Sequence, residues 1–341
     1  MEFILDGDSL LLSNNYIERT VQELYQGVGI ASACGTILPL QYRDIKEIKK
    51  SSGIKKFLDV LPNASISNEE SLSHRIMHAI TNMYRDVLYL FLQRFVYRGL
   101  MVFFGSIISP IGCAVAYRRK YIKDLFDKYE PILGDNLSNS DDIFIGFALD
   151  NEGYRNIQIL DVYARTQEPE IGNLPHQFYM WSSAYLQCCY YFNGLIMTPF
   201  KVIKYVINKR RAAREFEEKI KNLRKIQEPY RQAFGEHITK KYGRLIGWSI
   251  FSSAVEKIFF PVALLILILL QAWHYLFLTV FIEIIISQIV LLIIAKERRW
   301  SYFIKGLLVT PIRYSVLLFD LVNIGRFSLD LWFLKNRSWR K

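Results

Sequence analysis

The chain has few cysteines, and their spacing suits neither a disulfide framework nor a metal clip. Its 341 residues include four, none of them in a Cys-x-x-Cys pair: Cys34, Cys113, Cys188 and Cys189. Two adjacent cysteines cannot grip a metal as spaced pairs do. We therefore expect buried thiols in the core of a protein that is kept in a reducing compartment.

Charge is absent from one long stretch near the C-terminus. No charged residue occurs from Phe259 to Ile282, and after Glu283 the apolar run continues to Ala295. As a single helix this stretch would be roughly 55 Å long at ~1.5 Å per residue, against a hydrocarbon core of ~30 Å. That length is too great for one upright span and sufficient for two short ones.

Basic side chains on both sides of the run decide between one span and two. Three precede it and three follow it: Lys240, Lys241, Arg244, Lys296, Arg298 and Arg299. The positive-inside rule places both flanks in the cytoplasm. The sequence therefore predicts a transmembrane hairpin over residues 251–297 in an inner or plasma membrane, turning near residues 271–275 although no Gly or Pro marks a turn there.

Two other apolar segments carry charges that argue against spanning. A span at 185–207 would place the basic segment 208–244 outside, and the segment 303–325 contains Lys305, Arg313 and Asp320. We expect interfacial amphipathic helices over 183–250, and an interfacial C-terminal helix with a basic tail over 298–341.

The net charge of +11 is also typical of nucleic-acid binders. The basic residues gather beside the apolar segments, however, and this placement favours contact with anionic lipid headgroups. We therefore expect membrane lipids and no nucleic acid among the partners.

The first residues form a short apolar run that ends in two carboxylates. Residues 3–5 predict a buried strand whose carboxyl end presents Asp6 and Asp8, with Gly7 between them. Ligands bind outside the carboxyl ends of strands in open α/β sheets. Mg²⁺ or Mn²⁺ accepts one or two such carboxylates and completes its shell with phosphate oxygens and water. Alone, such a pair is more often a solvated turn.

Residues 1–182 alternate short apolar runs with polar connectors and predict an α/β domain. We expect a helix over 16–25, a strand over 28–35 and a long aromatic helix over 72–104 with a capped start at 67–70. His74 and His78 share one face of that helix. The residue after the first histidine is Arg75 rather than the glutamate of a zinc-protease motif, which favours surface histidines.

Four local motifs follow one another along the chain. They are Asp6-Gly7-Asp8, the segment 105–119, Ser140-Asp141-Asp142, and the segment 177–181 that reads Gln-Phe-Tyr-Met-Trp. Their order resembles the membrane-embedded family 2 glycosyltransferases, the group of hyaluronan, chitin and cellulose synthases. The resemblance implies a partial GT-A fold, which is a mixed sheet with flanking helices. It also implies a role in polysaccharide synthesis, by inverting transfer of sugar from a nucleotide-sugar to a glycan or lipid-linked acceptor. The donor in this family is usually a UDP-sugar.

The resemblance also implies a role for each matching residue. Asp6 and Asp8 would bind Mg²⁺ or Mn²⁺, and Asp142, with Asp141 beside it, would be the catalytic base. The place of Asp142 at the start of a predicted helix would favour the ionised form of its carboxylate. The remaining matches would bind the acceptor or the donor: Gly112, Cys113, Gln177 and Trp181 for the acceptor, Arg118 and Arg119 for the donor.

Two features depart from the family pattern. Met180 stands where the family has arginine, and methionine cannot pair with donor phosphates. Family members also carry a nucleotide-binding part before the Asp-x-Asp motif, whereas this sequence begins at it. We therefore expect the isolated chain to be catalytically incompetent, to bind nucleotide poorly and to expose an apolar sheet edge. It would need a separate N-terminal chain or a longer gene product.

The same departures support a different class of protein, a membrane-anchored inactive or split-gene remnant that acts as a binding or scaffold protein. A pore or transporter is disfavoured. The hairpin holds the single acidic residue Glu283, and transporter folds are usually built from more helices in repeats.

Overall fold

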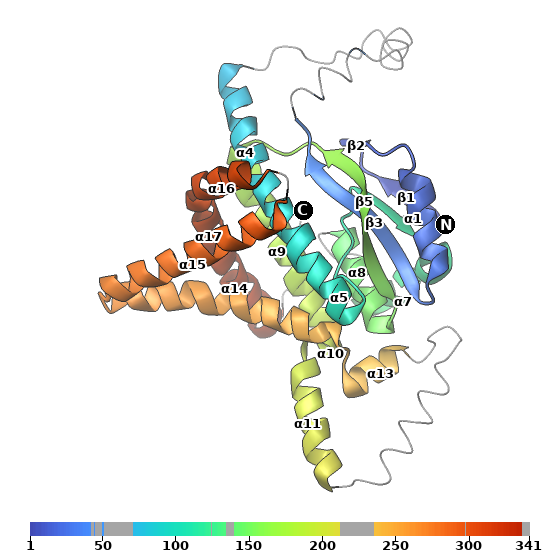
Figure 1. Ribbon diagram of the computed structural model, residues 1–341. Helices are drawn as coiled ribbons and strands as arrows, with labels where there is room; N and C mark the ends of the chain where they lie inside the picture. The colour runs from blue at the N-terminus through green and yellow to red at the C-terminus, as the bar shows by residue number, and fades with distance from the viewer. Residues whose placement is uncertain are drawn as a thin grey trace.

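The computed structural model describes residues 1–41, 44, 50, 71–123, 125–133, 140–211, 235–296 and 298–335. These residues form a five-stranded mixed sheet covered by helices, beside a group of apolar helices from which one hairpin projects (Figure 1). The predicted helix cap at 67–70, most of the basic segment 208–244 and most of the basic tail lie outside the described residues.

The sheet has the strand order β1-β4-β3-β5-β2. Its strands are β1 (Glu2–Leu5), β2 (Ser9–Leu11), β3 (Ile30–Pro39), β4 (Ala114–Tyr117) and β5 (Arg155–Thr166). The central pair β3 and β5 is parallel, and the other three pairs are antiparallel. The prediction of a mixed sheet with flanking helices is therefore confirmed.

The two edge strands are joined by only three residues, Asp6–Asp8. In a flat sheet the four strand spacings between β1 and β2 would amount to ~19 Å. The chain from Leu5 to Ser9 spans at most ~14 Å. The sheet must therefore curl, and the two edges approach each other at the Asp6–Asp8 turn.

The prediction that residues 3–5 are a buried strand is wrong. Strand β1 is an edge strand that pairs only with β4, and Ile4 and Leu5 are 37% and 44% exposed. Phe3 alone turns inward, packing edge-to-face on Tyr16 with ring centroids 5.9 Å apart. An edge strand has only one neighbour to bury its side chains, which explains the exposure.

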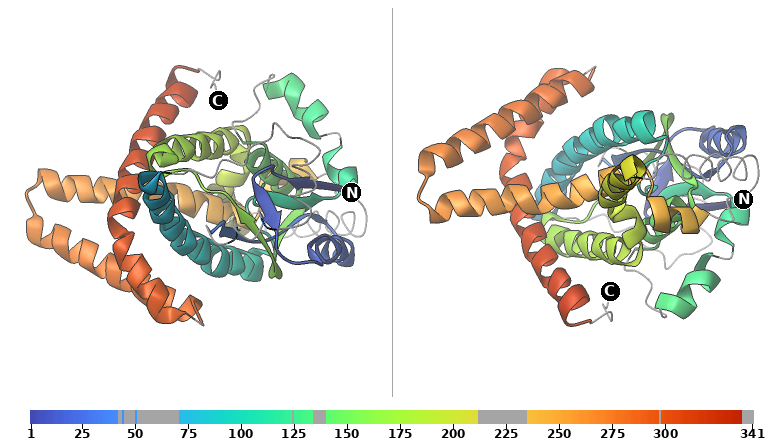
Figure 2. Two further views of the ribbon diagram at one scale, coloured as in Figure 1. Left: turned by 90° about the horizontal axis from the view of Figure 1, so that it is seen from above. Right: turned by 90° about the horizontal axis from the view of Figure 1, so that it is seen from below.

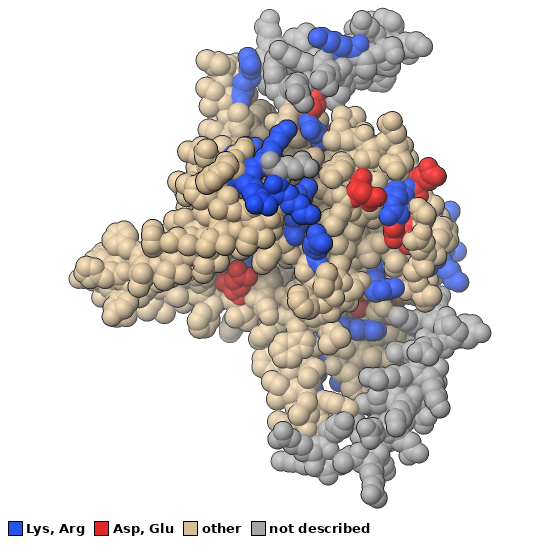
Figure 3. Space-filling view, in the orientation of Figure 1, with Lys and Arg blue, Asp and Glu red and all other residues tan. Residues whose placement is uncertain are grey.

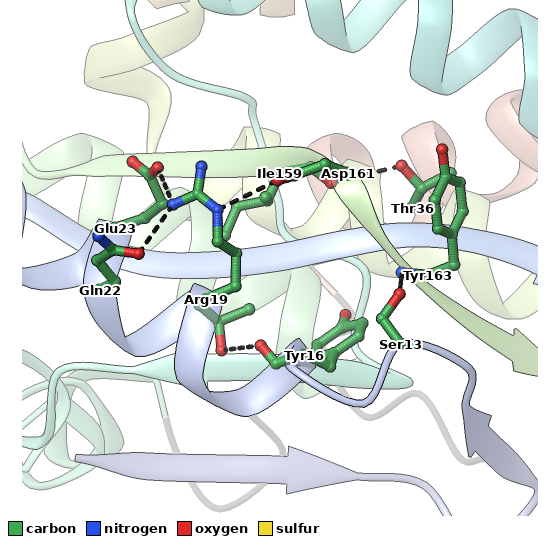
Figure 4. A network of polar contacts seen from close by, with 10 residues as sticks. Ser13, Tyr16, Arg19, Gln22, Glu23, Thr36, Ile159, Asp161 and Tyr163 are labelled. Carbon is green, nitrogen blue, oxygen red and sulfur yellow. Dashed lines mark hydrogen bonds and ion pairs between the residues drawn. The ribbon is translucent and has the colours of Figure 1, made fainter.

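Helix α1 (Tyr16–Gln26) matches the predicted helix and is fastened to the sheet by polar contacts. Arg19 forms ion pairs with Glu23 of the same helix at 2.5 Å and with Asp161 of β5 at 3.2 Å (Figure 4). The Ser13 hydroxyl accepts a hydrogen bond from the Tyr163 amide at 2.9 Å. These contacts set α1 across β5.

The long predicted helix is present, with a π-helical interruption. It runs through α4 (Leu72–Phe91), the π-helical η1 (Leu92–Tyr97) and α5 (Arg98–Phe104). The buried Gln93 in η1 donates to the carbonyl of Ile37 and accepts from its amide, both at 2.7 Å. The side-chain amide of Gln93, in the π-helical turn, is thus hydrogen-bonded to the backbone of β3.

Of eight further elements, three lie between β4 and β5 in the sequence and five follow β5. They are α6 (Arg119–Ile122), α7 (Leu125–Leu133), α8 (Asp141–Glu152), η2 (Ile171–Asn173), α9 (Leu174–Tyr191), α10 (Asn193–Ile196), α11 (Thr198–Arg211) and α13 (Gly235–Tyr242). Helices α8 and α9 pack on each other in the main core, which also holds Cys188 and Cys189. All four cysteines are buried and free, as predicted.

The predicted hairpin is present as α14 (Ile246–Leu269) and α15 (Trp273–Ile294), joined by a three-residue turn. Figures 1 and 2 show the two helices projecting together from the body. Gln271 takes the turn's left-handed conformation with φ 54°, which explains how a turn forms without glycine. Leu269 and Phe277 are largely exposed, as expected of side chains that face lipid.

Within the described residues, three helices are long and apolar enough to cross a membrane, or four if a bent pair counts as one span. Besides α14 and α15, the segment Leu72–Phe104 qualifies, a feature that the sequence analysis did not anticipate. The bent pair is Arg299–Leu308 (α16) with Thr310–Phe333, which contains α17 (Thr310–Ser328) and the π-helical η3 (Leu329–Phe333). The length and apolar composition of these helices indicate a membrane protein.

The charges expected to keep 303–325 at the interface are paired inside the protein. Arg313 contacts Glu283 of α15 at 2.6 Å, Asp320 contacts Lys257 of α14 at 2.7 Å, and Lys305 pairs with Asp86 of α4. Charges neutralised in this way no longer exclude a span. Two proposed domain boundaries also fall within helices, at residue 182 in α9 and residue 250 in α14.

The charge distribution agrees with a membrane location. Figure 3 shows the projecting hairpin without Lys or Arg on the visible face, while basic side chains gather on the body beside it. Near the end of α15, Lys296, Arg298 and Arg299 are exposed, and Arg94 donates to the carbonyl of Ile294 at 3.4 Å.

Tyr16 offers a test of the fold. Its buried hydroxyl donates to the Ala114 carbonyl at 2.8 Å and accepts from the Gly35 amide at 2.7 Å. Tyr16→Phe leaves the Gly35 amide without its partner, and we expect a loss of ~1–3 kcal/mol in the free energy of unfolding. Unfolding of the detergent-solubilised chain measures it, with the exposed Tyr25→Phe as control. Equal stability of the two variants would contradict the predicted anchor.

Candidate active site

A cavity of about 400 Å³ lies where the Asp6–Asp8 turn, the start of β4, α8, the end of β5 and α9 meet. Eight of the ten residues singled out from the sequence line it: Asp6, Asp8, Gly112, Cys113, Asp141, Asp142, Gln177 and Trp181. These residues come from four segments that are far apart in the sequence. The structure therefore brings most of the predicted site together.

The Asp6–Asp8 turn is held by backbone hydrogen bonds to both edges of the sheet. The Asp6 amide donates to the Cys113 carbonyl at 3.0 Å, extending the pairing of β1 with β4. The Gln167 amide, just after β5, donates to the Asp8 carbonyl at 3.2 Å. The turn is thus fixed from both sides, and both carboxylates face the cavity.

The carboxylates at this turn repel one another. Partial burial raises the pKa of Asp6, and the charges of Asp8 and Asp142 raise it further. No Lys or Arg lies among the described residues that line the cavity. A cation bound here would relieve the repulsion, which fits the chemistry of a divalent metal.

Asp6 and Asp8 are the residues that could hold such a metal. Among the described ranges, no group of three or more His, Cys, Asp and Glu side chains is arranged as a metal site. A Mg²⁺ or Mn²⁺ ion that shares its shell with substrate phosphates needs only one or two protein carboxylates. The two aspartates fit that smaller requirement.

Asp142 lies in the first turn of α8, as expected, and three donors surround its carboxylate. The Gly112 amide donates to Oδ2 at 3.1 Å, the Ile143 amide to Oδ1 at 2.9 Å, and the Ser140 hydroxyl donates to Oδ1 as well. These bonds lower the pKa of Asp142, but burial raises it more, so the net shift is upward. The expectation that the helix start favours the ionised form is therefore outweighed by desolvation.

Gly112 allows the close approach of two segments. A Cβ atom at this position would lie 2.8 Å from Asp142 Oδ2 and 2.9 Å from Asp142 Cβ. Any side chain there would displace the carboxylate. Gly112 thus supports Asp142 directly, a role in addition to the acceptor contact implied by resemblance.

Arg118 and Arg119 are not part of the cavity. The Arg118 guanidinium lies 4.9 Å from the Tyr25 ring centroid and donates to the Tyr121 hydroxyl at 3.1 Å. Arg119 begins α6 and is exposed. Tyr117 just before them lines the cavity, but neither arginine does, so the geometry gives no support to the donor-binding role predicted for them.

Sequence analysis missed several residues of the site. Tyr89, Gln167 and Glu168 line the cavity, and Arg85 lies behind it, in contact with Gln177 and Trp181. The sequence pattern around these residues gives only a weak indication of a site. Glu168 follows a strand much as Asp6 does, and Arg85 is a charge within an aromatic helix.

Manganese binding tests the carboxylate pair. We expect the purified chain to bind Mn²⁺ in the presence of pyrophosphate, and Asp8→Asn to weaken that binding at least tenfold because it removes a charged oxygen ligand. Electron paramagnetic resonance of free Mn²⁺ gives the affinity. The control is Asp161→Asn, since this aspartate is 60% exposed on β5 and outside the cavity. Unchanged affinity in Asp8→Asn would remove Asp8 from the site.

No protein-family model matches the chain, and no curated protein matches it either. The cavity and its residues are therefore the features that indicate a function.

Proposed function

We propose that the chain is the catalytic part of an inverting, metal-dependent glycosyltransferase with a GT-A-like core. It moves a sugar from a nucleotide-sugar, a UDP-sugar by family resemblance, to a glycan or lipid-linked acceptor. The cavity would face the cytoplasmic side of an inner or plasma membrane. The observation that carries the proposal is one cavity that unites an Asp-x-Asp turn, a buried Asp142 and the Gln177–Trp181 pair.

The proposed reaction is a single displacement at the anomeric carbon of the donor sugar. The acceptor oxygen forms a bond to that carbon while the bond from the carbon to the diphosphate oxygen breaks, and Asp142 accepts the acceptor's proton. The products are the extended acceptor and a nucleoside diphosphate. A divalent metal, when bound at Asp6 and Asp8, would supply positive charge to the leaving diphosphate.

The acceptor would lie against the side of the cavity formed by α9. Trp181 offers an apolar ring surface for the C–H face of a sugar, and Gln177 offers amide hydrogen bonds for its hydroxyls. Asp142 is the carboxylate best placed for the base role, since its three donors fix its orientation.

A second candidate function is a membrane-anchored binding or scaffold protein with an inactive transferase core. Strand β1 lies at the edge of the sheet, and its Ile4 and Leu5 are exposed beside Asp6. This favours a binding function, because an apolar edge strand can pair with a strand of another chain along its outer side. A separate N-terminal chain would be the partner of that edge. Mn²⁺ binding without sugar transfer would distinguish this function from the enzyme.

Replacing the proposed base tests the enzyme. Membranes carrying the product of the full-length gene should incorporate labelled sugar from one of UDP-glucose, UDP-N-acetylglucosamine and UDP-glucuronate. Asp142→Asn should lower incorporation at least ~100-fold, the typical contribution of a general base. The matched control Asp161→Asn should retain activity. Wild-type activity in Asp142→Asn would contradict the assignment, and incorporation from none of the donors would favour the scaffold.

The pH dependence of transfer provides a separate test. A base acts only when deprotonated, and burial raises the pKa of Asp142 above the ordinary 3.8, so activity should rise with pH above that value. The Ser140 hydroxyl stabilises the charged form. Ser140→Ala should therefore move the acid limb of kcat/KM to higher pH, whereas the exposed Ser73→Ala should not. A limb that stays in place or moves to lower pH would contradict the role of Asp142.

A further inference from the structure

Arg85 is the most deeply buried charged residue of the described chain, with no exposed surface. Its guanidinium lies among three aromatic rings, with centroids at 4.6 Å for Trp181, 5.2 Å for Phe178 and 5.7 Å for Tyr84. Phe178 packs edge-to-face on each of the other two rings. A charge placed in such a setting is costly unless it is paired and hydrogen-bonded.

The pairing partners of Arg85 come from two other segments. Arg85 Nε lies 3.1 Å from Glu168 Oε2, and its Nη2 donates to Gln177 Oε1. The second oxygen of Glu168 accepts from the Tyr89 hydroxyl at 2.6 Å. Arg85 thereby connects α4, the segment after β5, and α9.

The contacts of Arg85 are themselves walls of the cavity. Tyr89, Glu168, Gln177 and Trp181 all line it, while Arg85 stands behind them. Because Gln177 Oε1 is engaged by Arg85, the amide NH₂ is the group left to face the cavity. The guanidinium lies 4.6 Å from the Trp181 ring centroid, and Trp181 also lines the cavity, so Arg85 holds a ring that a ligand can contact.

The charge of the cavity limits which ligand this wall accepts. Five carboxylates line the described cavity, namely those of Asp6, Asp8, Asp141, Asp142 and Glu168, without a Lys or Arg. The nearby cation, Arg85, is hidden and already neutralised by Glu168. A sugar that carries a carboxylate would meet repulsion here, whereas a neutral pyranose would meet a ring face and hydrogen-bond donors.

We propose that the Arg85–Glu168 pair is a positioning device that fixes Gln177 and Trp181 as a binding wall for a neutral pyranose of the acceptor. The inference rests on the proposed transferase function for its role in turnover. As a statement about binding it depends only on the cavity.

The variants are chosen to separate positioning from stability. Arg85→Met and Glu168→Met each leave an unpaired buried charge, so both should lower the thermal midpoint. The double variant removes both charges and should recover most of that loss. If the pair also positions the wall, the double variant should still show an acceptor KM at least tenfold higher than wild type. A purely structural pair would recover the KM together with the midpoint, and that result would overturn the proposal.

A second measurement distinguishes the acceptor wall from the donor site. Hydrolysis of the nucleotide-sugar by water uses Asp8 and Asp142 but no acceptor sugar. We expect the double variant to lose transfer to the acceptor at least tenfold more than it loses hydrolysis. Loss of hydrolysis in parallel with transfer would show that Arg85 does not act on the acceptor side, and would overturn the proposal while leaving the transferase function in place.

Sugar binding can be measured without turnover. In the 5-fluorotryptophan-labelled chain, the ¹⁹F resonance of Trp181 is identified by its loss in Trp181→Phe. Chitotetraose or cellotetraose should shift this resonance in the wild type and not in the double variant, and trigalacturonate should not shift it. If the shifts appear but no donor is turned over, the proposed function fails and the binding inference stands. No shift with either neutral probe, or an equal shift with trigalacturonate, would overturn the inference.

Discussion

The turn of three residues between the two edge strands is the constraint on which the site depends. A chain this short cannot cross a flat five-stranded sheet, so the sheet curls until β1 and β2 approach each other at Asp6–Asp8. The backbone of Cys113 holds one side of the turn and that of Gln167 the other. Both carboxylates are therefore fixed between the start of β4 and the end of β5, and residues of α8 and α9 line the same cavity. The cavity results from this closure.

The curl also concentrates like charges, and the rest of the site responds to them. Asp6 is pushed toward the protonated form by desolvation and by two neighbouring carboxylates, whereas Asp142 is held by three hydrogen-bond donors that partly offset its burial. Glycine at 112 is required because any Cβ there would collide with Asp142. A cation bound beside Asp6 and Asp8 would reduce this repulsion. The carboxylates that line the cavity therefore give the metal proposal a support that the Asp-x-Asp spacing alone does not.

Features set by local pattern were predictable, and features set by distant contacts were not. The start of α8 at Asp141, helix α1 and the hairpin follow from acidic residues in a first helical turn, periodicity and uninterrupted apolar composition, respectively. The exposure of β1 depends on which strand lies beside it, so residues 3–5 alone could not reveal it. Arg118 follows a strand as a site residue would, yet it stacks on Tyr25. The contacts of Arg85 with Glu168 and Gln177 join residues more than 80 positions apart, beyond any short-range pattern.

Two helices connect the cavity with the apolar helices. Successive residues of a helix point ~100° apart, so on α4 Arg85 faces the cavity wall while Asp86 pairs with Lys305 and accepts from Tyr302 of α16. On α9, Gln177 and Trp181 line the cavity, and Ser182 bonds Asp320 of α17, which is paired with Lys257 of α14. The Asp6–Asp8 turn has no described ion pair to these helices. The contacts of α16 and α17 therefore extend to the cavity wall formed by Gln177 and Trp181, and no described ion pair extends them to the Asp6–Asp8 turn.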